Sequence, residues 1–172
     1  MNAALTTTTL AISEVTPADL DEWVAMALLL WPAEEESAEQ ALLEMRAELE
    51  GILQSPRDTA LIVRDGDGVA IAFMNLSLCN EYVPGATRFP VAYVEGIYVA
   101  DCARKSGVGA ALMQRAQMWA TENDCTQMAS DVLIENEESC RFHTRVGFEE
   151  VERVVCFIKD VSKQVENQVE NS

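Results

Sequence analysis

The chain of 172 residues carries little positive charge and almost no histidine. Lysine and arginine number 12 against 29 aspartates and glutamates, which gives a formal net charge of −17 at pH 7. Because nucleic-acid binding needs basic surfaces, this balance argues against a nucleic-acid partner. It would suit a polycationic partner, although many proteins are acidic for solubility alone. His143 is the only histidine, which excludes histidine-rich metal centres and disfavours a Ser-His-Asp hydrolase.

Long apolar runs and paired cysteines are also missing. No apolar stretch approaches the roughly 20 residues of a membrane-spanning helix, and the first residues, MNAALTTTTLAI, lack the basic start of a secretory signal. The five cysteines are scattered and form no C-x-x-C pair, which disfavours a disulfide framework or a zinc site. We therefore expect a cytoplasmic protein that holds no metal and does not bind a membrane.

What is present predicts one globular domain. Apolar residues make up 49% of the chain and charged residues 24%, a composition that supports a single core, and the length is short for two domains. We expect a flexible leader at 1–9, one domain over 10–161 and a polar C-terminal tail at 162–172.

Apolar spacing and turn residues predict the element order β-α-α-β-β-β-α-β-α-β. We expect strands at 10–16, in both arms of a hairpin over 59–78, and at 91–99, 127–132 and 149–161. Helices are expected at 17–31, 37–53, 107–121 and 137–146, and Ser37 with Gln40 has the spacing of a capping box. Tight turns make the early strands antiparallel, whereas the strand-helix-strand unit over 91–132 should be parallel. The predicted fold class is α/β (α+β), with a mixed, mostly antiparallel central sheet and helices on both faces.

The segment ARKSGVGAALMQRA, 103–116, gathers cations and glycines at one helix start. A helix N-terminus presents unpaired amides and a positive dipole end, and Gly107 and Gly109 would let a phosphate approach them. Arg104 and Lys105 add charged donors. The segment is therefore a candidate pyrophosphate cradle, with a glycine-rich helix start bearing solvated cations as the alternative. It is not a P-loop, since G-x-x-x-x-G-K-[ST] is absent, and GVGAAL lacks the third glycine of G-x-G-x-x-G.

Two ordered patterns point to a known family. RKSGVG, 104–109, fits [RQ]-x-x-G-x-[GA] after a strand, and 136–148 resembles N-x-x-A-x-x-[FL]-Y-x-x-x-G-[FY]. Together they resemble the GCN5-related N-acetyltransferase (GNAT) superfamily. The segments LLLWP, EYVPG, PVAYVEGIYV, ASD and GFEEVERVVCF look like its aminoglycoside 6′-N-acetyltransferase subgroup, and the likeness spans about 10–161.

The resemblance implies an enzyme that transfers acetyl from acetyl-CoA, its cosubstrate, to the 6′-amine of aminoglycoside antibiotics. Acetyl-CoA would lie between parallel strands 91–99 and 127–132, which splay apart in the family. The residues implied for its binding are Ile97, Val99, Arg104, Lys105, Gly107, Val108, Gly109, Ala110, Asn136 and His143. The Ile97 N–H would stabilise charge developing on the thioester oxygen.

Two acids inside apolar strands, Glu95 and Asp131, are the candidates for orienting and deprotonating the amine and for binding substrate ammonium groups. A lone buried carboxylate is costly, so such an acid usually faces a cavity, a cation or a donor. Acids at a solvated edge are the alternative, and which of the two is the base stays open. His143 stands where many relatives have a tyrosine; it would be the general acid, or would only contact CoA.

Trp31 and Tyr82 would line the sugar pocket with flat faces, although Trp31 could instead close the core at a helix end. Only one strand follows the last helix, so we expect a second copy to complete the sheet in a homodimer. Two alternatives stay open: acetylation of another amine, such as a polyamine or a peptide N-terminus, and a non-catalytic acetyl-CoA sensor.

Overall fold

The computed structural model describes residues 10–33 and 37–161, so the expected leader at 1–9 and tail at 162–172 lie outside the described residues. The strands are β1 (Ala11–Glu14), β2 (Asp58–Arg64), β3 (Ala70–Cys79), β4 (Val91–Val99) and β5 (Met128–Ser130). The helices are α1 (Leu20–Leu30), α2 (Ala38–Gln54), α3 (Val108–Glu122) and α4 (Glu137–Arg145), with short 3-10 turns at Pro17–Asp19 and Asp101–Ala103.

The strands form one sheet in the order β1-β2-β3-β4-β5. The first four strands pair antiparallel, and β4 pairs parallel with β5 across the α3 crossover. This confirms the predicted mixed, mostly antiparallel sheet with one parallel pair. The parallel pairing covers Ala92–Val94 against Met128–Ser130, after which β4 continues alone to Val99. The expected strand at 127–132 is therefore shorter than predicted.

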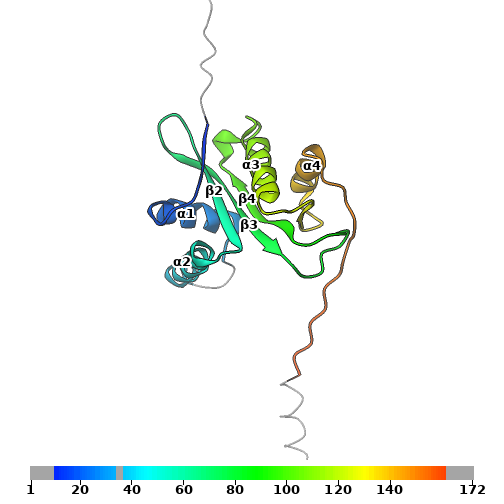
Figure 1. Cartoon of the computed structure of the whole chain (residues 1–172). Coiled ribbons are helices and arrows are strands. Elements are labelled where there is room, and N and C mark those ends of the chain that lie inside the picture. The colour runs from blue at the N-terminus through cyan, green and yellow to red at the C-terminus, as the bar shows by residue number, and fades with distance from the viewer. Residues whose placement is uncertain (1–9, 34–36, 162–172) are drawn as a thin grey trace, which may run out of the picture.

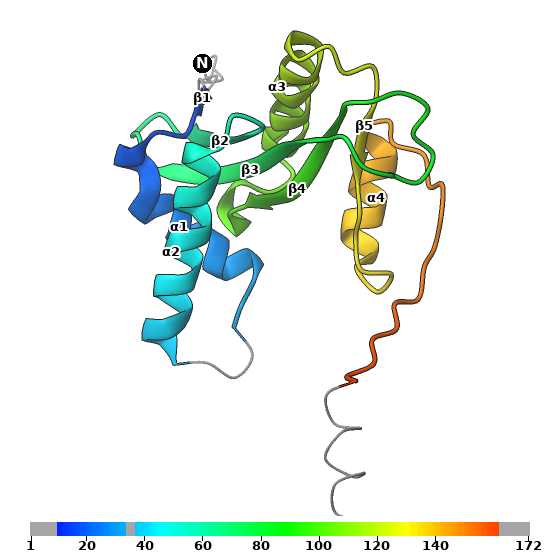
Figure 2. The same ribbon diagram turned by 60° about the horizontal axis from the view of Figure 1, so that its bottom comes forward.

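Helices cover both faces of the sheet because β2 and β3 are apolar on both sides. Leu61 and Met74 belong to the core beneath α3, whereas Ile62 and Phe73 belong to the core beneath α1 and α2. Figures 1 and 2 show α1 and α2 together on one face and α3 on the other, with α4 beyond α3 near β5. Strands buried on both faces are continuously apolar, as the sequence of this hairpin is.

The start of α2 matches only half of the predicted capping box. Ser37 Oγ accepts a hydrogen bond from the Gln40 amide at 3.2 Å, as the spacing predicts. The Gln40 side chain does not return to the cap; it donates to Glu44 Oε1 at 2.9 Å, one helical turn further on. Both bonds stabilise the first turns of the helix.

A β-bulge interrupts the pairing of β3 with β4 in the middle of the sheet. Asn75 pairs with Gly96 and Leu76 pairs with Val94, which leaves Glu95 as the extra residue of the bulge. The Asn75 side chain is buried, and its Oδ1 accepts a hydrogen bond from Trp23 Nε1 at 3.1 Å. A bulge locally re-aims side chains, so this irregularity determines where the Glu95 carboxylate points.

The prediction of a strand at 149–161 is wrong for the single chain, in which this segment forms no strand. In the described part of the chain no sheet partner reaches this segment, and Phe157 and Ile158 are 92% and 101% exposed. Figure 1 shows it leaving the body of the molecule beyond α4. Its residues suit a strand, but a strand needs the hydrogen-bonding edge of another, and β5, at the near side of the sheet, is only three residues long.

Candidate active site

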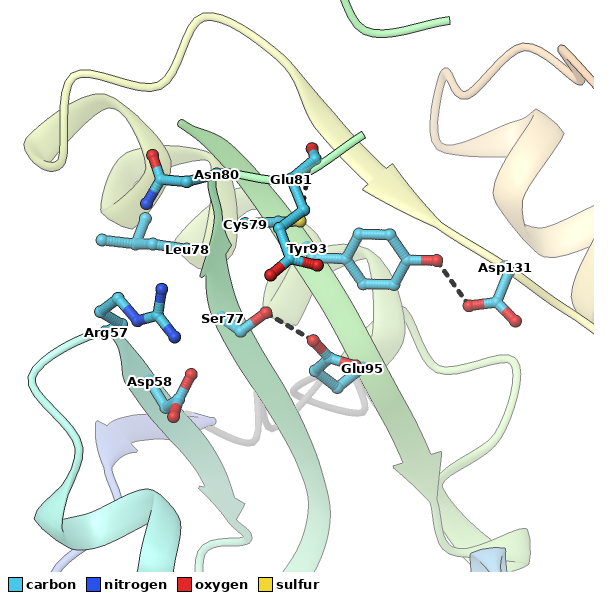
Figure 3. A pocket seen from close by; sticks show the side chains of 10 residues that line it. All are labelled: Arg57, Asp58, Ser77, Leu78, Cys79, Asn80, Glu81, Tyr93, Glu95 and Asp131. Atoms are coloured by element: carbon cyan, nitrogen blue, oxygen red, sulfur yellow. Dashed lines mark hydrogen bonds between the residues drawn. The ribbon is translucent and has the colours of Figure 1, made fainter. Parts of the chain in front are cut away.

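A cavity of about 470 Å³ opens on the sheet where β3, β4 and the chain after β5 meet (Figure 3). Tyr93 and Glu95 are two residues apart on β4, and Ser77 of β3 pairs with Tyr93. The cavity is lined by Arg57, Asp58, Ser77, Leu78, Cys79, Asn80, Glu81, Tyr93, Glu95 and Asp131. It therefore joins residues from the hairpin, the loop after it, and the parallel strand pair.

Hydroxyl groups hold two of the carboxylates in this cavity. Ser77 Oγ donates to Glu95 Oε1 at 2.5 Å, and the Tyr93 hydroxyl donates to Asp131 Oδ1 at 2.6 Å. Burial raises the pKa of Tyr93 well above its usual value, and the hydrogen bond to Asp131 raises it further. Tyr93 is therefore a protonated donor at every pH at which the fold is expected to work.

The cavity is electrostatically negative. It gathers the carboxylates of Asp58, Glu81, Glu95 and Asp131 and a single guanidinium, that of Arg57. Like charges at close quarters favour the entry of cations, so the cavity suits a ligand with several ammonium groups.

Both acids predicted as catalytic, Glu95 and Asp131, line this cavity, whereas the two predicted aromatic residues do not. Trp31 follows α1, and its ring packs over Gly96, where an added Cβ would come within 2.4 Å of Cζ2. The ring thus lies against the residue next to Glu95, on the bulge. Tyr82 lies in the loop after β3 and is 81% exposed.

The predicted pyrophosphate cradle has the backbone geometry of a helix start. Gly107 adopts φ +93° before α3, a conformation that favours glycine. The first helical bond runs from the Ala111 amide to the Gly107 carbonyl, so the preceding amides of Val108, Gly109 and Ala110 have no acceptor within the helix.

The two cations of the cradle differ in what they contact. Arg104 donates from Nε to the Val99 carbonyl at 3.1 Å and pairs with Asp101 at 3.1 Å, so its guanidinium also fastens the turn to the end of β4. Lys105 adopts φ +61° and is exposed. Within the described residues no hydrogen bond or ion pair holds the Lys105 ammonium, which is thus free for a ligand.

The start of α3 lies close to both β4 and α4. A Cβ on Gly109 would lie 3.0 Å from Cε2 of Phe142 and 3.9 Å from Cδ1 of Ile97. Ile97 is therefore next to the start of α3, as the predicted arrangement of thioester and pyrophosphate contacts requires.

Asn136 and His143 both hold α4 in place. Asn136 Oδ1 accepts from the Ser139 amide at 3.0 Å as the helix cap, which leaves its amide nitrogen as a donor. His143 Nδ1 lies 2.8 Å from the Ser139 carbonyl, and Nε2 lies 3.2 Å from Ser130 Oγ. Ser130 Oγ donates to the Val94 carbonyl at 3.2 Å, so His143 connects α4 to the last paired residues of β4 and β5.

Sequence reasoning missed six polar residues of the cavity: Arg57, Asp58, Ser77, Asn80, Glu81 and Tyr93. For Tyr93 a signal existed, because side chains two apart in a strand share a face and Glu95 was already a candidate. Asp58 and Glu81 gave no such signal, since each stands at a strand end where charged residues are common.

In the described part of the chain no three His, Cys, Asp or Glu side chains are grouped so that they could hold a metal ion. Likewise, none of the helices found there is long and apolar enough for a membrane span.

A mixed sheet with a parallel pair, a glycine-containing helix start beside it and an acidic cavity define an acetyltransferase of the GNAT class. Residues 23–148 match the model of the Acetyltransferase (GNAT) family, and the chain belongs to that family.

The chain is 41% identical over 141 residues to the aminoglycoside N(6')-acetyltransferase type 1 of Serratia marcescens, covering 82% of this chain and 92% of that protein. Among solved structures, it is similar to the 6'-N-acetyltransferase AAC(6')-Ih of Acinetobacter baumannii, with a TM-score of 0.81, 33% identity and coverage of 89% and 99%. It is also similar to AAC(6')-Iy in complex with the bisubstrate analogue CoA-S-monomethyl-acetylneamine, with a TM-score of 0.78, 34% identity and coverage of 88% and 99%.

Proposed function

We propose that this protein transfers an acetyl group from acetyl-CoA to the 6′-amine of aminoglycosides. The observation that carries the proposal is the acidic cavity, which is lined by Glu95 from β4 and by Asp131 from the residue after β5. Glu95 is next to Gly96 and two residues from Ile97 on the same strand. The relatives named as aminoglycoside N(6')-acetyltransferases support the substrate class.

The residues at the start of α3 fit the diphosphate of coenzyme A. The free amides of Val108, Gly109 and Ala110 and the Lys105 ammonium offer the donors that a pyrophosphate needs. When bound, acetyl-CoA supplies the activated acyl group. The Ile97 amide would stabilise charge on the thioester oxygen, Val99 would pair with the pantetheine arm, and the Asn136 amide nitrogen would donate to it.

The carboxylates of the cavity perform two tasks. Aminoglycoside amines are largely protonated near neutrality, so a carboxylate must accept a proton before the nitrogen can attack. As the new C–N bond forms and the C–S bond breaks, one proton leaves the amine nitrogen and one reaches the departing sulfur. Glu95, aimed by the bulge and held by Ser77, is well placed to orient and deprotonate the amine.

His143 is the proposed source of the proton for the sulfur. Nδ1 faces the Ser139 carbonyl and therefore carries a proton in either ring state. Nε2 lies 3.2 Å from Ser130 Oγ, whose hydroxyl donates to the Val94 carbonyl, so Ser130 Oγ can accept a hydrogen bond from an Nε2–H group. The ring packs edge-on between Phe142 and Phe148, which keeps it at the divergence of the strands.

Trp31 and Tyr82 would contact the sugar rings at the rim of the cavity. Trp31 is 39% exposed, so part of its face is available to a ring or an ammonium group. Tyr82 is exposed and directly follows Glu81, which lines the cavity, as a rim contact requires.

The deciding experiment is a thiol-release assay across aminoglycosides with and without a 6′-amine, polyamines and peptides. We expect turnover of the compounds with a 6′-amine, and a loss of about 10²-fold or more in kcat/KM for Glu95→Gln. Coenzyme A binding measured by calorimetry should be unchanged in that variant. No turnover of any 6′-amine aminoglycoside by the wild-type chain would refute the proposal.

We also propose that the enzyme works as a homodimer. Val151 packs against Gly85, where an added Cβ would lie 2.9 Å from Val151 Cγ1, and beyond it the apolar side chains of the segment 154–161 are exposed. A second copy offers the sheet edge that this segment lacks, and its burial would remove apolar surface from water.

The physiological role we propose is antibiotic resistance, exerted in the cytoplasm. The free thiols of all five cysteines suit a reducing compartment. Expression in a susceptible bacterium should raise the inhibitory concentration of 6′-amine aminoglycosides, and the Glu95→Gln variant should not.

A further inference from the structure

The Asp131 carboxylate stands one residue after β5, where regular pairing has already ended. The parallel pairing stops at Val94 and Ser130, so the backbone bonds of the sheet do not extend to Asp131. Of the described residues, Tyr93 alone donates a hydrogen bond to this carboxylate, and no ion pair reaches it. Its direction in the cavity therefore depends on the Tyr93 hydroxyl (Figure 3).

Asp131 also lines a cavity that contains other carboxylates. The titratable and charged groups that line the same cavity are Arg57, Asp58, Cys79, Glu81, Tyr93 and Glu95. Three of these are carboxylates, whose negative charges repel that of Asp131. The Tyr93 hydroxyl opposes this repulsion, because its hydrogen bond to Oδ1 holds the Asp131 carboxylate in one direction.

We propose that Tyr93 is a positioning residue that keeps the Asp131 carboxylate aimed into the cavity, so that Asp131 anchors a substrate ammonium group while Glu95 acts on the reacting amine. This inference rests on the proposed function, and it divides between two residues the roles that the sequence leaves open. The division follows from the geometry: Glu95 lies on the bulge beside Gly96, whereas Asp131 is tied back to β4 by a hydroxyl.

Tyr93 is not itself the proton donor to the sulfur. Its hydroxyl points to Asp131, and burial together with that bond raises the pKa of the phenol. A phenol that holds its proton more tightly is a poorer acid near neutrality but a permanent hydrogen-bond donor. Its contribution should therefore appear in substrate binding and not in the proton-transfer step.

The test compares Tyr93→Phe with Tyr98→Phe, the same substitution on the same strand. Tyr98 stacks on Phe73 and does not line the cavity, so its variant controls for the loss of a β4 hydroxyl. The ring of residue 93 is kept, and equal thermal midpoints would show that the fold is intact. Wild-type turnover of a 6′-amine aminoglycoside is measured first, since its absence defeats the proposed function and not this inference alone.

We expect Tyr93→Phe to raise the KM for the aminoglycoside and its calorimetric Kd in the presence of coenzyme A about tenfold, with kcat within about twofold. The KM for acetyl-CoA should not move.

A double-mutant cycle separates this role from ordinary packing. In an Asp131→Ala background, adding Tyr93→Phe should change the aminoglycoside KM by less than about twofold, because the hydroxyl acts through the carboxylate. An unchanged KM in Tyr93→Phe, an equal effect in Tyr98→Phe, a fall in kcat alone, or full additivity with Asp131→Ala would each overturn the inference.

Discussion

The indole ring of Trp31 lies directly over Gly96, so closely that a Cβ at residue 96 would come within 2.4 Å of Cζ2 and 2.5 Å of Cη2. Gly96 pairs with Asn75, and Glu95, the extra residue of the bulge, precedes it. The absence of a side chain at Gly96 thus lets a helix-end aromatic ring rest on the strand that carries the proposed base.

This contact predicts that Gly96→Ala displaces Trp31. Overpacking of this kind costs about 1–3 kcal/mol of the free energy of unfolding, which urea denaturation would measure. The aminoglycoside KM should rise and the KM for acetyl-CoA should stay unchanged, since the cradle is elsewhere. Gly51→Ala is the matched control: nothing lies within 4 Å of its new Cβ, and in a helix interior it should stabilise by roughly 0.5–1 kcal/mol. Equal effects from both variants would contradict the contact.

The ion pairs of Arg64 predict a stability that falls in acid. Arg64 bonds to Asp19 at 2.6 Å and to Glu22 at 2.5 Å. Hydrogen bonds from Thr16 and then Arg64 lower the pKa of Asp19, and the bond from Arg64 lowers the pKa of Glu22. Groups whose pKa is lowered by folding stabilise the fold above their unfolded pKa values, about 4, and lose that contribution as the pH falls through the folded values.

We expect Arg64→Gln to lower the free energy of unfolding by about 1–2 kcal/mol at pH 7, and by less as the pH falls through the lowered pKa values of the two carboxyls. Urea denaturation at pH 7, 5 and 3 would measure this. Arg46→Gln is the control, because Arg46 pairs with an Asp21 side chain that is 85% exposed; its cost should be smaller than that of Arg64→Gln at pH 7. If the difference in free energy of unfolding between wild type and Arg64→Gln did not change with pH, the ion pairs of Arg64 would not be its source.

His143 as general acid predicts a kcat effect. His143→Gln keeps polar groups near Ser130 but cannot supply a proton, so kcat should fall by about 10²-fold or more. Steady-state kinetics should show KM values for both substrates within about threefold of wild type. The neighbouring Thr144→Ala should keep the wild-type rate, since among the described residues the Thr144 hydroxyl bonds only to the Cys140 carbonyl. A near-normal kcat in His143→Gln would show that the departing sulfur receives its proton from another donor.

The proposed dimer predicts a mass of twice 19.0 kDa in light scattering at micromolar concentration. Ile158→Glu would place a charge in the segment that a second copy is expected to cover, and should shift the mass toward the monomer. Val69→Glu is the control, because Val69 is an exposed apolar residue in the turn between β2 and β3. A monomeric wild-type chain at these concentrations would refute the dimer.

Much of the fold could be predicted from the sequence because its signals are local. The bounds of β4, the turn of the β2–β3 hairpin and the start of α3 follow from alternation, from glycine conformation and from helix capping. The same locality made the Gly107 region recognisable, since its free amides depend only on where the helix begins. Glu95 and Asp131 were predicted as site residues because burying a carboxylate without a partner is costly, so an acid in an apolar stretch usually faces a cavity, a cation or a donor.

Other features depend on which distant segments meet, and only the tertiary structure decided them. Tyr93 reaches Asp131, and Trp23 reaches Asn75, across separations that no local pattern records. The register that makes Glu95 a bulge residue is likewise a property of two strands together. The segment 149–161 has the composition of a strand, but a strand forms only where a complementary hydrogen-bonding edge exists, and among residues 10–33 and 37–161 none lies beside it.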